Sequence, residues 1–202
     1  MLPRFESASQ TAGPYVHIGL VPSRAGIQKA PIVTHDLCAQ GIPDSALPIE
    51  VCGQVLDGSG SPIYDAVVEL WQADHLGQYQ ARANQGFRGW GRSAIDPDNG
   101  HFLFKTIKPG SVPCRANMFM APHLALWIVA RGINLGLHTR MYFPEDSALH
   151  QTDPVLNTIE IKRRRSTLIA ACAVDADPDR SPIRYSFDIV IQGDQETVFF
   201  DI

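Results

Sequence analysis

Residues 184–192 read RYSFDIVIQ, and this stretch decides the fold class. Its apolar side chains alternate with mainly polar neighbours, and they are Tyr185, Phe187, Ile189 and Ile191. Successive side chains of a β-strand point to opposite faces, so a period of two indicates a half-buried strand. Residues 101–107 (HFLFKTI) show the same pattern, with Phe102 and Phe104 on one face. Both stretches are expected to be strands that turn one face to a core.

Four further strands are expected outward from these two, at residues 48–57, 66–72, 124–131 and 137–143. The first two are short, rich in β-branched residues and separated by GSGSP, which is typical of a connection between strands. LALWIVAR, the third, is apolar on both faces and indicates an interior strand, whereas LHTRMYF, the fourth, is mixed and indicates a position towards the rim.

The remaining segments complete the predicted architecture. Only residues 164–174 suggest a short helix, while residues 1–46 and 80–99 are expected to be long loops. With 16 Gly and 15 Pro spread between short strands, the sequence predicts an all-β fold, an antiparallel β-sandwich with long loops and little helix. Residues 1–202 are expected to form a single domain, with residues 1–46 as an N-terminal arm and loop region of a length that usually serves function or contacts.

Composition excludes several classes of function. The net charge of -4 and the pI near 5.9 provide no basic field for nucleic acid, and residues 162–165 (KRRR) are expected to form a solvated face. No apolar run is long enough to predict a membrane helix. The N-terminal residues lack the pattern of a signal peptide, and the four cysteines are scattered. We therefore expect a cytoplasmic protein with reduced thiols.

Common catalytic motifs are missing from the sequence. Seven histidines are present, but no HExxH or HxH pair occurs, and neither does GxSxG, GxxxxGK or GxGxxG. A lone histidine such as His123 is by itself expected to be a hydrogen-bonded residue. The tryptophans Trp71, Trp90 and Trp127 lie in or near apolar segments and are expected to pack in the core. Motifs alone name no reaction.

A colinear series of short segments nevertheless resembles the intradiol ring-cleaving dioxygenases. The segments are SQTAGPYVHIGL (residues 9–20), ELWQAD and LGQY (69–79), FKTIKPG (104–110), APH (121–123), ARGINLGLHTRMYF (130–143), RYSFDIVIQG (184–193) and ETVFFDI (196–202). Each is short, but their order and spacing are specific over nearly the whole chain. The resemblance implies a β-sandwich of the intradiol dioxygenase type. Some members of the family are built from an alpha chain and a beta chain, and this sequence specifically resembles the alpha chain.

The family holds a ferric ion with two tyrosines and two histidines, and here that set is incomplete. By the resemblance, Tyr79 and His123 stand at the first tyrosine and the first histidine, but Val112 and Ala125 stand at the second ones. Met120 also replaces the basic residue that precedes the APH segment. A hard trivalent cation needs several anionic or neutral donors, so two cannot hold it. The resemblance therefore implies vestigial ligand positions, no metal on this chain and no catalytic residue in this chain alone.

The resemblance assigns this chain a role at an interface, and it implies that the arm at residues 1–46 contacts the partner chain. It implies a beta-chain partner that binds Fe(3+), with the aromatic substrate and O2 at a shared site and a larger hetero-oligomer. Thr11, Gly13, Pro14 and Tyr15 are expected to border the substrate pocket, and Arg131 is expected to hold a carboxylate or an acidic side chain of the partner.

Two other hypotheses remain open at this point. The chain could be a stand-alone β-sandwich that binds an aromatic ligand or a protein without catalysis. It could instead be a self-contained metal enzyme in which His75 or His101 joins Tyr79 and His123 as ligands. The loop at residues 11–15 could also be an ordinary surface turn, and Arg131 could form only a structural salt bridge at an interface.

Overall fold

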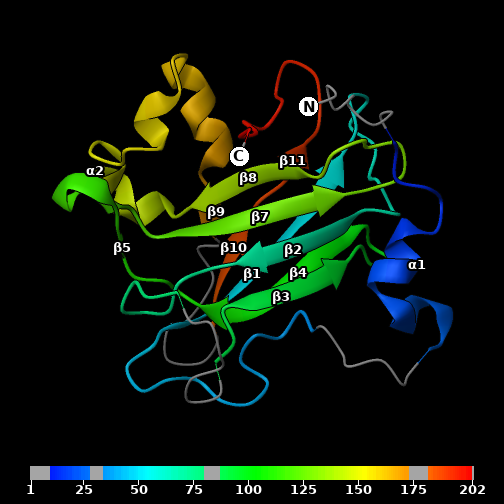
Figure 1. Ribbon diagram of the computed structural model, residues 1–202, viewed down its shortest axis with the longest axis horizontal. Coiled ribbons are helices and arrows are strands. Elements are labelled where there is room, and N and C mark those ends of the chain that lie inside the picture. Colours follow the sequence, from blue (N-terminus) through cyan, green and yellow to red (C-terminus); the bar gives the residue numbers. More distant parts are fainter. Residues whose placement is uncertain (1–9, 28–33, 80–86, 173–181, 202) are drawn as a thin grey trace, which may run out of the picture.

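Two β-sheets pack face to face in this protein (Figure 1), whose computed structural model describes residues 10–27, 34–79, 87–172 and 182–201. One cluster of buried side chains draws on both sheets, including Val51 and Phe104 from one and Leu70 and Leu126 from the other. Burial of such side chains is the main stabilising contribution in a sandwich. The predicted all-β sandwich with little helix is confirmed.

The first sheet is built around β1. Its strands are β1 (Pro48–Leu56), β4 (His101–Ile107), β9 (Ala171–Cys172), β10 (Ile183–Ser186) and β11 (Ile189–Val190). β4 runs antiparallel to β1, whereas β10 and β11 both pair with β1 in parallel. β9 pairs antiparallel with β10. The fold is thus mostly antiparallel, with one parallel junction between its early and late strands.

A glycine allows that parallel junction to form. The expected strand at 184–192 is interrupted between β10 and β11, where the Phe187 N–H donates to the Cys52 carbonyl at 2.8 Å. A Cβ atom at Gly53 would lie 1.9 Å from the carbonyl oxygen of Phe187. No heavy atom can be accommodated at that distance, so the close approach of the two backbones requires glycine here.

The second sheet is fully antiparallel and carries the candidate site. Its strand order is β3 (Trp90–Ala94), β2 (Val67–Trp71), β7 (His123–Val129) and β8 (Leu137–Tyr142). β7 is interior and β8 is at the edge, as predicted, and consecutive β1 and β2 lie in different sheets. The expectation of a loop over residues 80–99 was wrong for β3. Its inward positions, Gly91 and Ser93, are small, so it lacks the apolar alternation that reveals a strand.

Short elements fill the connections. They are α1 (Val16–Leu20), η1 (Pro22–Ala25), β5 (Val112–Pro113), η2 (Arg115–Asn117), β6 (Phe119–Met120), η3 (Pro144–Asp146), α2 (Ser147–His150), η4 (Leu156–Thr158) and η5 (Lys162–Leu168). The helix expected at 164–174 was wrong in extent, since η5 ends at Leu168 and β9 follows. The basic run at 162–165 is only partly solvated, because Arg164 pairs with Glu196 at 2.9 Å.

Two features bear on the environment of the chain. No helix among the described residues is long and apolar enough to cross a membrane. None of the four cysteines, Cys38, Cys52, Cys114 and Cys172, forms a disulfide. Burial raises the pKa of the Cys38 thiol to about 11, so this side chain packs as a neutral, small hydrophobe.

Candidate functional site

The outer face of the second sheet carries a row of residues that crosses all its strands. Cross-strand pairing places Trp90 opposite Trp71, Trp71 opposite Ala125, and Ala125 opposite Arg140. Directly opposed side chains of neighbouring strands have Cβ atoms about 5 Å apart. The methyl group of Ala125 therefore leaves a gap in the row, between an indole on one side and a guanidinium on the other.

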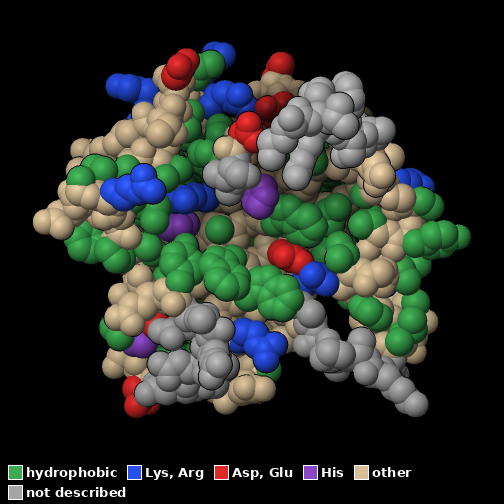
Figure 2. Space-filling model, in the orientation of Figure 1, with side chains coloured by type: hydrophobic (Ala, Val, Ile, Leu, Met, Phe, Trp, Pro, Cys, Tyr) green, Lys and Arg blue, Asp and Glu red, His purple; other side chains and the backbone are tan. Residues whose placement is uncertain are grey.

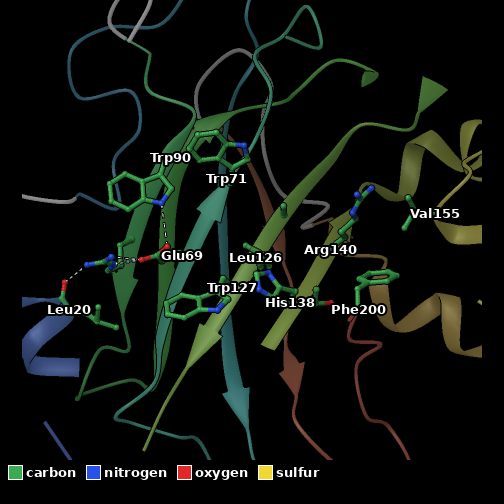
Figure 3. A pocket seen from close by; sticks show the side chains of 13 residues that line it. Leu20, Glu69, Trp71, Trp90, Leu126, Trp127, His138, Arg140, Val155 and Phe200 are labelled. Carbon is green, nitrogen blue, oxygen red and sulfur yellow. Dashed lines mark hydrogen bonds and ion pairs between the residues drawn. The ribbon is translucent and has the colours of Figure 1, made fainter. Parts of the chain in front are cut away.

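A second row lies beside the first. Arg92 faces Glu69, Glu69 faces Trp127, and Trp127 faces His138. Arg92 is fully engaged, because it pairs with Glu69 and also donates to the Leu20 carbonyl of α1 at 2.6 Å. These contacts, drawn as dashed lines in Figure 3, fix one end of α1 against the sheet.

Together the two rows form the floor of a cavity of about 650 Å³. We call it the tryptophan hollow, and it is lined by Leu20, Glu69, Trp71, Trp90, Arg92, Ala125, Leu126, Trp127, His138, Thr139, Arg140, Val155 and Phe200. Figure 3 shows Trp71 and Trp90 at one end and Trp127, His138 and Phe200 further along the sheet. Hydrophobic side chains gather over this part of the molecule in Figure 2.

The expected core position of the three tryptophans was wrong. Trp71 is 46% exposed, and Trp90 and Trp127 are half-buried in the wall of the hollow. Each occupies an outward position of its strand, since its sequence neighbours on that strand point into the core. An apolar surface of this kind on a folded protein usually marks a binding site.

Tyr79 and His123, which the resemblance places at the first tyrosine and the first histidine of the ligand set, meet at one side of this hollow. The Tyr79 hydroxyl lies 3.4 Å from His123 Nε2, and its ring stacks on Trp71 with centroids 6.2 Å apart. His123 Nδ1 lies 2.8 Å from the Ala121 carbonyl, which can only accept. Nδ1 therefore carries the proton, and Nε2 accepts from the tyrosine hydroxyl.

Burial holds both side chains in their neutral forms. It lowers the pKa of His123 to about 4, and the nearby Arg140 guanidinium adds to this effect. Burial also raises the pKa of the Tyr79 phenol, although Arg140 opposes the rise. Because Arg140 acts on both groups, its charge lies close to Tyr79 and His123.

This environment predicts a pH dependence of stability. The pKa of His123 falls from 6.5 to about 4 on folding, so only the unfolded chain takes up this proton between those pH values. Folding stability should therefore fall as the pH drops through this window, by on the order of 1 kcal/mol per pH unit from this residue. Urea unfolding of the wild type and of His123→Gln at a series of pH values measures the contribution, and parallel curves for the two proteins would contradict it.

The donor set does not suit a ferric ion. Val112, at the expected second tyrosine, is 5% exposed on β5 and offers only a hydrocarbon side chain. Ala125 offers a methyl group, and the residue opposite it is the cation Arg140. Among the described residues, no three His, Cys, Asp or Glu side chains form a cluster that could hold a metal. His101 lies on β4 of the other sheet. These residues fit no hard trivalent cation.

A buried carboxylate, that of Asp153, lies behind this site and was not predicted from the sequence. Asp153 is 0% exposed and accepts from the Ala121 N–H at 2.7 Å and from the N–H groups of Val155 and Leu156, both at 2.8 Å. The Tyr142 hydroxyl donates to it at 3.4 Å. Asp153 thus links the turn at 153–156 to the chain just before β7. The DP pair at 153–154 is a common turn signal that could have indicated it.

The N-terminal loop and Arg131 are brought together at another place. Ala12 accepts from the Gly132 N–H and donates to the Ile133 carbonyl, both at 3.1 Å, so the loop at 11–15 runs beside the turn after β7. Thr11, Gly13, Pro14 and Tyr15 are exposed, with Tyr15 at 75%. Arg131 was expected at the end of the strand, but it lies in that turn. Its Nε is 3.3 Å from Asp65 Oδ2.

The family of this chain follows from its sequence and fold together. The dioxygenase family model, Dioxygenase_C, matches residues 21–193. The chain belongs to the intradiol ring-cleaving dioxygenase family, whose members depend on ferric iron.

Within this family, the chain is similar to the individual chains of protocatechuate 3,4-dioxygenase. The chain is 45% identical over 200 residues to the protocatechuate 3,4-dioxygenase alpha chain of Pseudomonas putida, covering 97% of this chain and 96% of that one. It is 35% identical to the beta chain from Burkholderia cepacia, over 74% of this chain and 66% of that one. Catechol 1,2-dioxygenase from Acinetobacter sp. ADP1 shares the fold, with a TM-score of 0.58, 17% identity and coverage of 87% and 68%.

Proposed function

We propose that this chain is the iron-free alpha subunit of a protocatechuate 3,4-dioxygenase. Its partner would be the beta chain, which holds Fe(3+), and the assembly would cleave protocatechuate between its hydroxylated carbons to 3-carboxy-cis,cis-muconate. One observation carries the proposal. The chain resembles alpha chains over nearly its full length, yet Val112 and Ala125 break the family's ligand set. A partner that supplies the metal accounts for both facts. The cytoplasmic location of the protein stays a prediction.

The loop at 11–15 and Arg131 are the surface that we assign to the shared pocket. Pro14 restricts the backbone, and Gly13 has no atom near the position of a Cβ, which leaves room for close approach of a ligand or partner. The backbone bonds between Ala12 and the turn at 132–133 hold the loop beside Arg131. The exposed phenol of Tyr15 in this loop and the exposed guanidinium of Arg131 in the adjacent turn, which also pairs with Asp65, suit an aromatic acid and the rim of a partner's pocket.

The metal on the partner would supply Lewis-acid chemistry to the catechol oxygens. This chain would contribute positioning. Tyr15 would present a flat ring to the substrate and exclude water, and the Arg131 guanidinium would hold a carboxylate through charge-assisted hydrogen bonds. Neither role requires a proton transfer from this chain.

Co-expression with a beta chain of this family tests the proposal. The alpha chain alone should contain no stoichiometric iron and show no oxygen uptake with protocatechuate. The purified complex should contain ferric iron and consume oxygen. If the isolated alpha chain binds stoichiometric ferric iron and turns over, the proposal is wrong and the ligand positions were misassigned. If no complex forms with the beta chain, the stand-alone hypothesis takes its place.

The loop itself gives a second expected result. In the complex, Tyr15→Ala should slow oxygen uptake by roughly tenfold to a hundredfold, because the ring that orients the substrate is lost while the iron remains. Iron content should not change. Tyr15→Phe keeps the ring and should retain most of the activity, and Ile161→Ala removes a side chain that is 52% exposed elsewhere on the surface. Equal rates for Tyr15→Ala and Ile161→Ala would refute the assignment of Tyr15 to the pocket.

A further inference from the structure

The tryptophan hollow has a size and a lining that suit a small ligand. Its volume of about 650 Å³ lies within the range of ligand pockets. Its aromatic lining consists of all three tryptophans of the chain together with Phe200. Flat aromatic molecules pack well against such walls, because offset stacking adds to the burial of apolar area.

The charges in the hollow are unbalanced. Of the two arginines that line it, Arg92 is neutralised by Glu69 and bound to the Leu20 carbonyl. Arg140 is different, because among the described residues its NH1 donates only to the weak acceptor sulfur of Met120 at 3.3 Å and to the Tyr142 hydroxyl at 3.5 Å, and that hydroxyl in turn donates to Asp153 Oδ1 at 3.4 Å. Within the described part of the chain, Arg140 forms no ion pair. A partly buried guanidinium without a carboxylate partner favours an anion beside it.

Strand register places this charge at the edge of the gap. Arg140 is directly opposite Ala125, and Ala125 is directly opposite Trp71 on its other side. A side chain larger than alanine at 125 would fill the space between the indole and the guanidinium. As it stands, a planar ring can lie over Ala125 against Trp71, with an acidic substituent directed at Arg140.

We propose that the tryptophan hollow binds an aromatic carboxylate, with Arg140 as its anion-binding residue. Arg140 lies near Tyr79 and His123. Its guanidinium, a fixed organic cation, therefore stands near the place where the family's ligand set would hold a metal. The hollow would thus bind the anion without a metal. This inference concerns binding by this chain and requires no turnover.

Calorimetric titration of the full-length chain with 2-naphthoate tests the proposal, because this probe has a ring and a carboxylate but no vicinal hydroxyls that would chelate iron. One site per chain is expected. The neutral amide, 2-naphthamide, and the ringless anion, acetate, should each bind at least tenfold more weakly, since each lacks one of the two recognised features. Tryptophan emission should change on binding, because all three tryptophans line the hollow.

Variants separate this site from general adsorption. Arg140→Gln should weaken naphthoate binding by roughly tenfold to a hundredfold, the size expected for loss of a charge-assisted hydrogen bond. Arg184→Gln removes an exposed arginine that pairs with Glu50 on the other sheet and should have no effect. Equal affinities for the amide and the acid, or unchanged affinity in Arg140→Gln, would overturn the proposal.

The same titration on the iron-loaded complex decides whether the site exists in the assembly. Tryptophan emission should still respond, and Arg140→Gln should still weaken that response. Loss of the response on assembly would overturn the proposal, because the hollow would then be covered by the partner. Iron content and oxygen uptake are read separately, so failure of this inference and failure of the subunit assignment are distinguishable.

Discussion

Replacement of Asp153 by alanine is expected to lower the free energy of unfolding by about 3–5 kcal/mol, because several buried donors would each lose their acceptor at a cost of about 1–3 kcal/mol. Asp153 is fully buried and accepts from three backbone N–H groups and one hydroxyl. Without it, the Ala121 N–H and the Tyr142 hydroxyl lose an acceptor in a place that water does not reach. Urea unfolding followed by circular dichroism measures the loss.

Asp57 provides the matched control. It also accepts from two backbone N–H groups and a hydroxyl, those of Ser59 and Ser61, but it is exposed to solvent. Water can replace the carboxylate there, so Asp57→Ala should cost much less stability than Asp153→Ala. If both variants unfold at the same urea concentration, burial is not what makes Asp153 important.

Gly53→Ala is the second substitution with a large expected effect. The new methyl carbon would lie 1.9 Å from the Phe187 carbonyl oxygen and 3.1 Å from the Phe102 ring. The nearer obstacle is backbone, so β1 must separate from the segment between β10 and β11. We expect a loss of about 3 kcal/mol or more in the free energy of unfolding, together with a weaker parallel junction.

The same substitution at Gly19 is the control. No atom lies within 4 Å of the position of its Cβ, and the residue is exposed in α1. Gly19→Ala should leave stability unchanged or raise it slightly, because alanine favours helix over glycine. Hydrogen exchange of the β1 and β10 amides would show whether Gly53→Ala acts at the junction. Full protection of these amides in Gly53→Ala would contradict the steric explanation.

The sequence predicted those strands that have one apolar face. β4 and the segment at 184–192 show clear alternation, because their inward residues are large and apolar while their outward ones are polar. β3 escaped notice because Gly91 and Ser93 face inwards. The tryptophans were misplaced for a related reason. A strand whose outer face is also apolar has no alternation, so the pattern cannot tell which side is core.

The candidate site was predicted only in part. Motif order located Tyr79 and His123, and the structure brings them within hydrogen-bond distance. It also places the loop at 11–15 beside Arg131. Arg140 could not be singled out, because its importance depends on register. Only the pairing of β7 with β8 shows that it faces Ala125, and pairing partners are not readable from one sequence.

The parallel pairing of β1 with β10 and β11 has a consequence for biosynthesis. Ile49 pairs with Ile183, so one edge of β1 has its partner only after more than a hundred further residues have been made. Contacts so distant along the chain make folding slow, and an unpaired edge strand is prone to aggregate meanwhile. The nascent chain should therefore depend on chaperones until residues 183–190 have been made and can pair with β1.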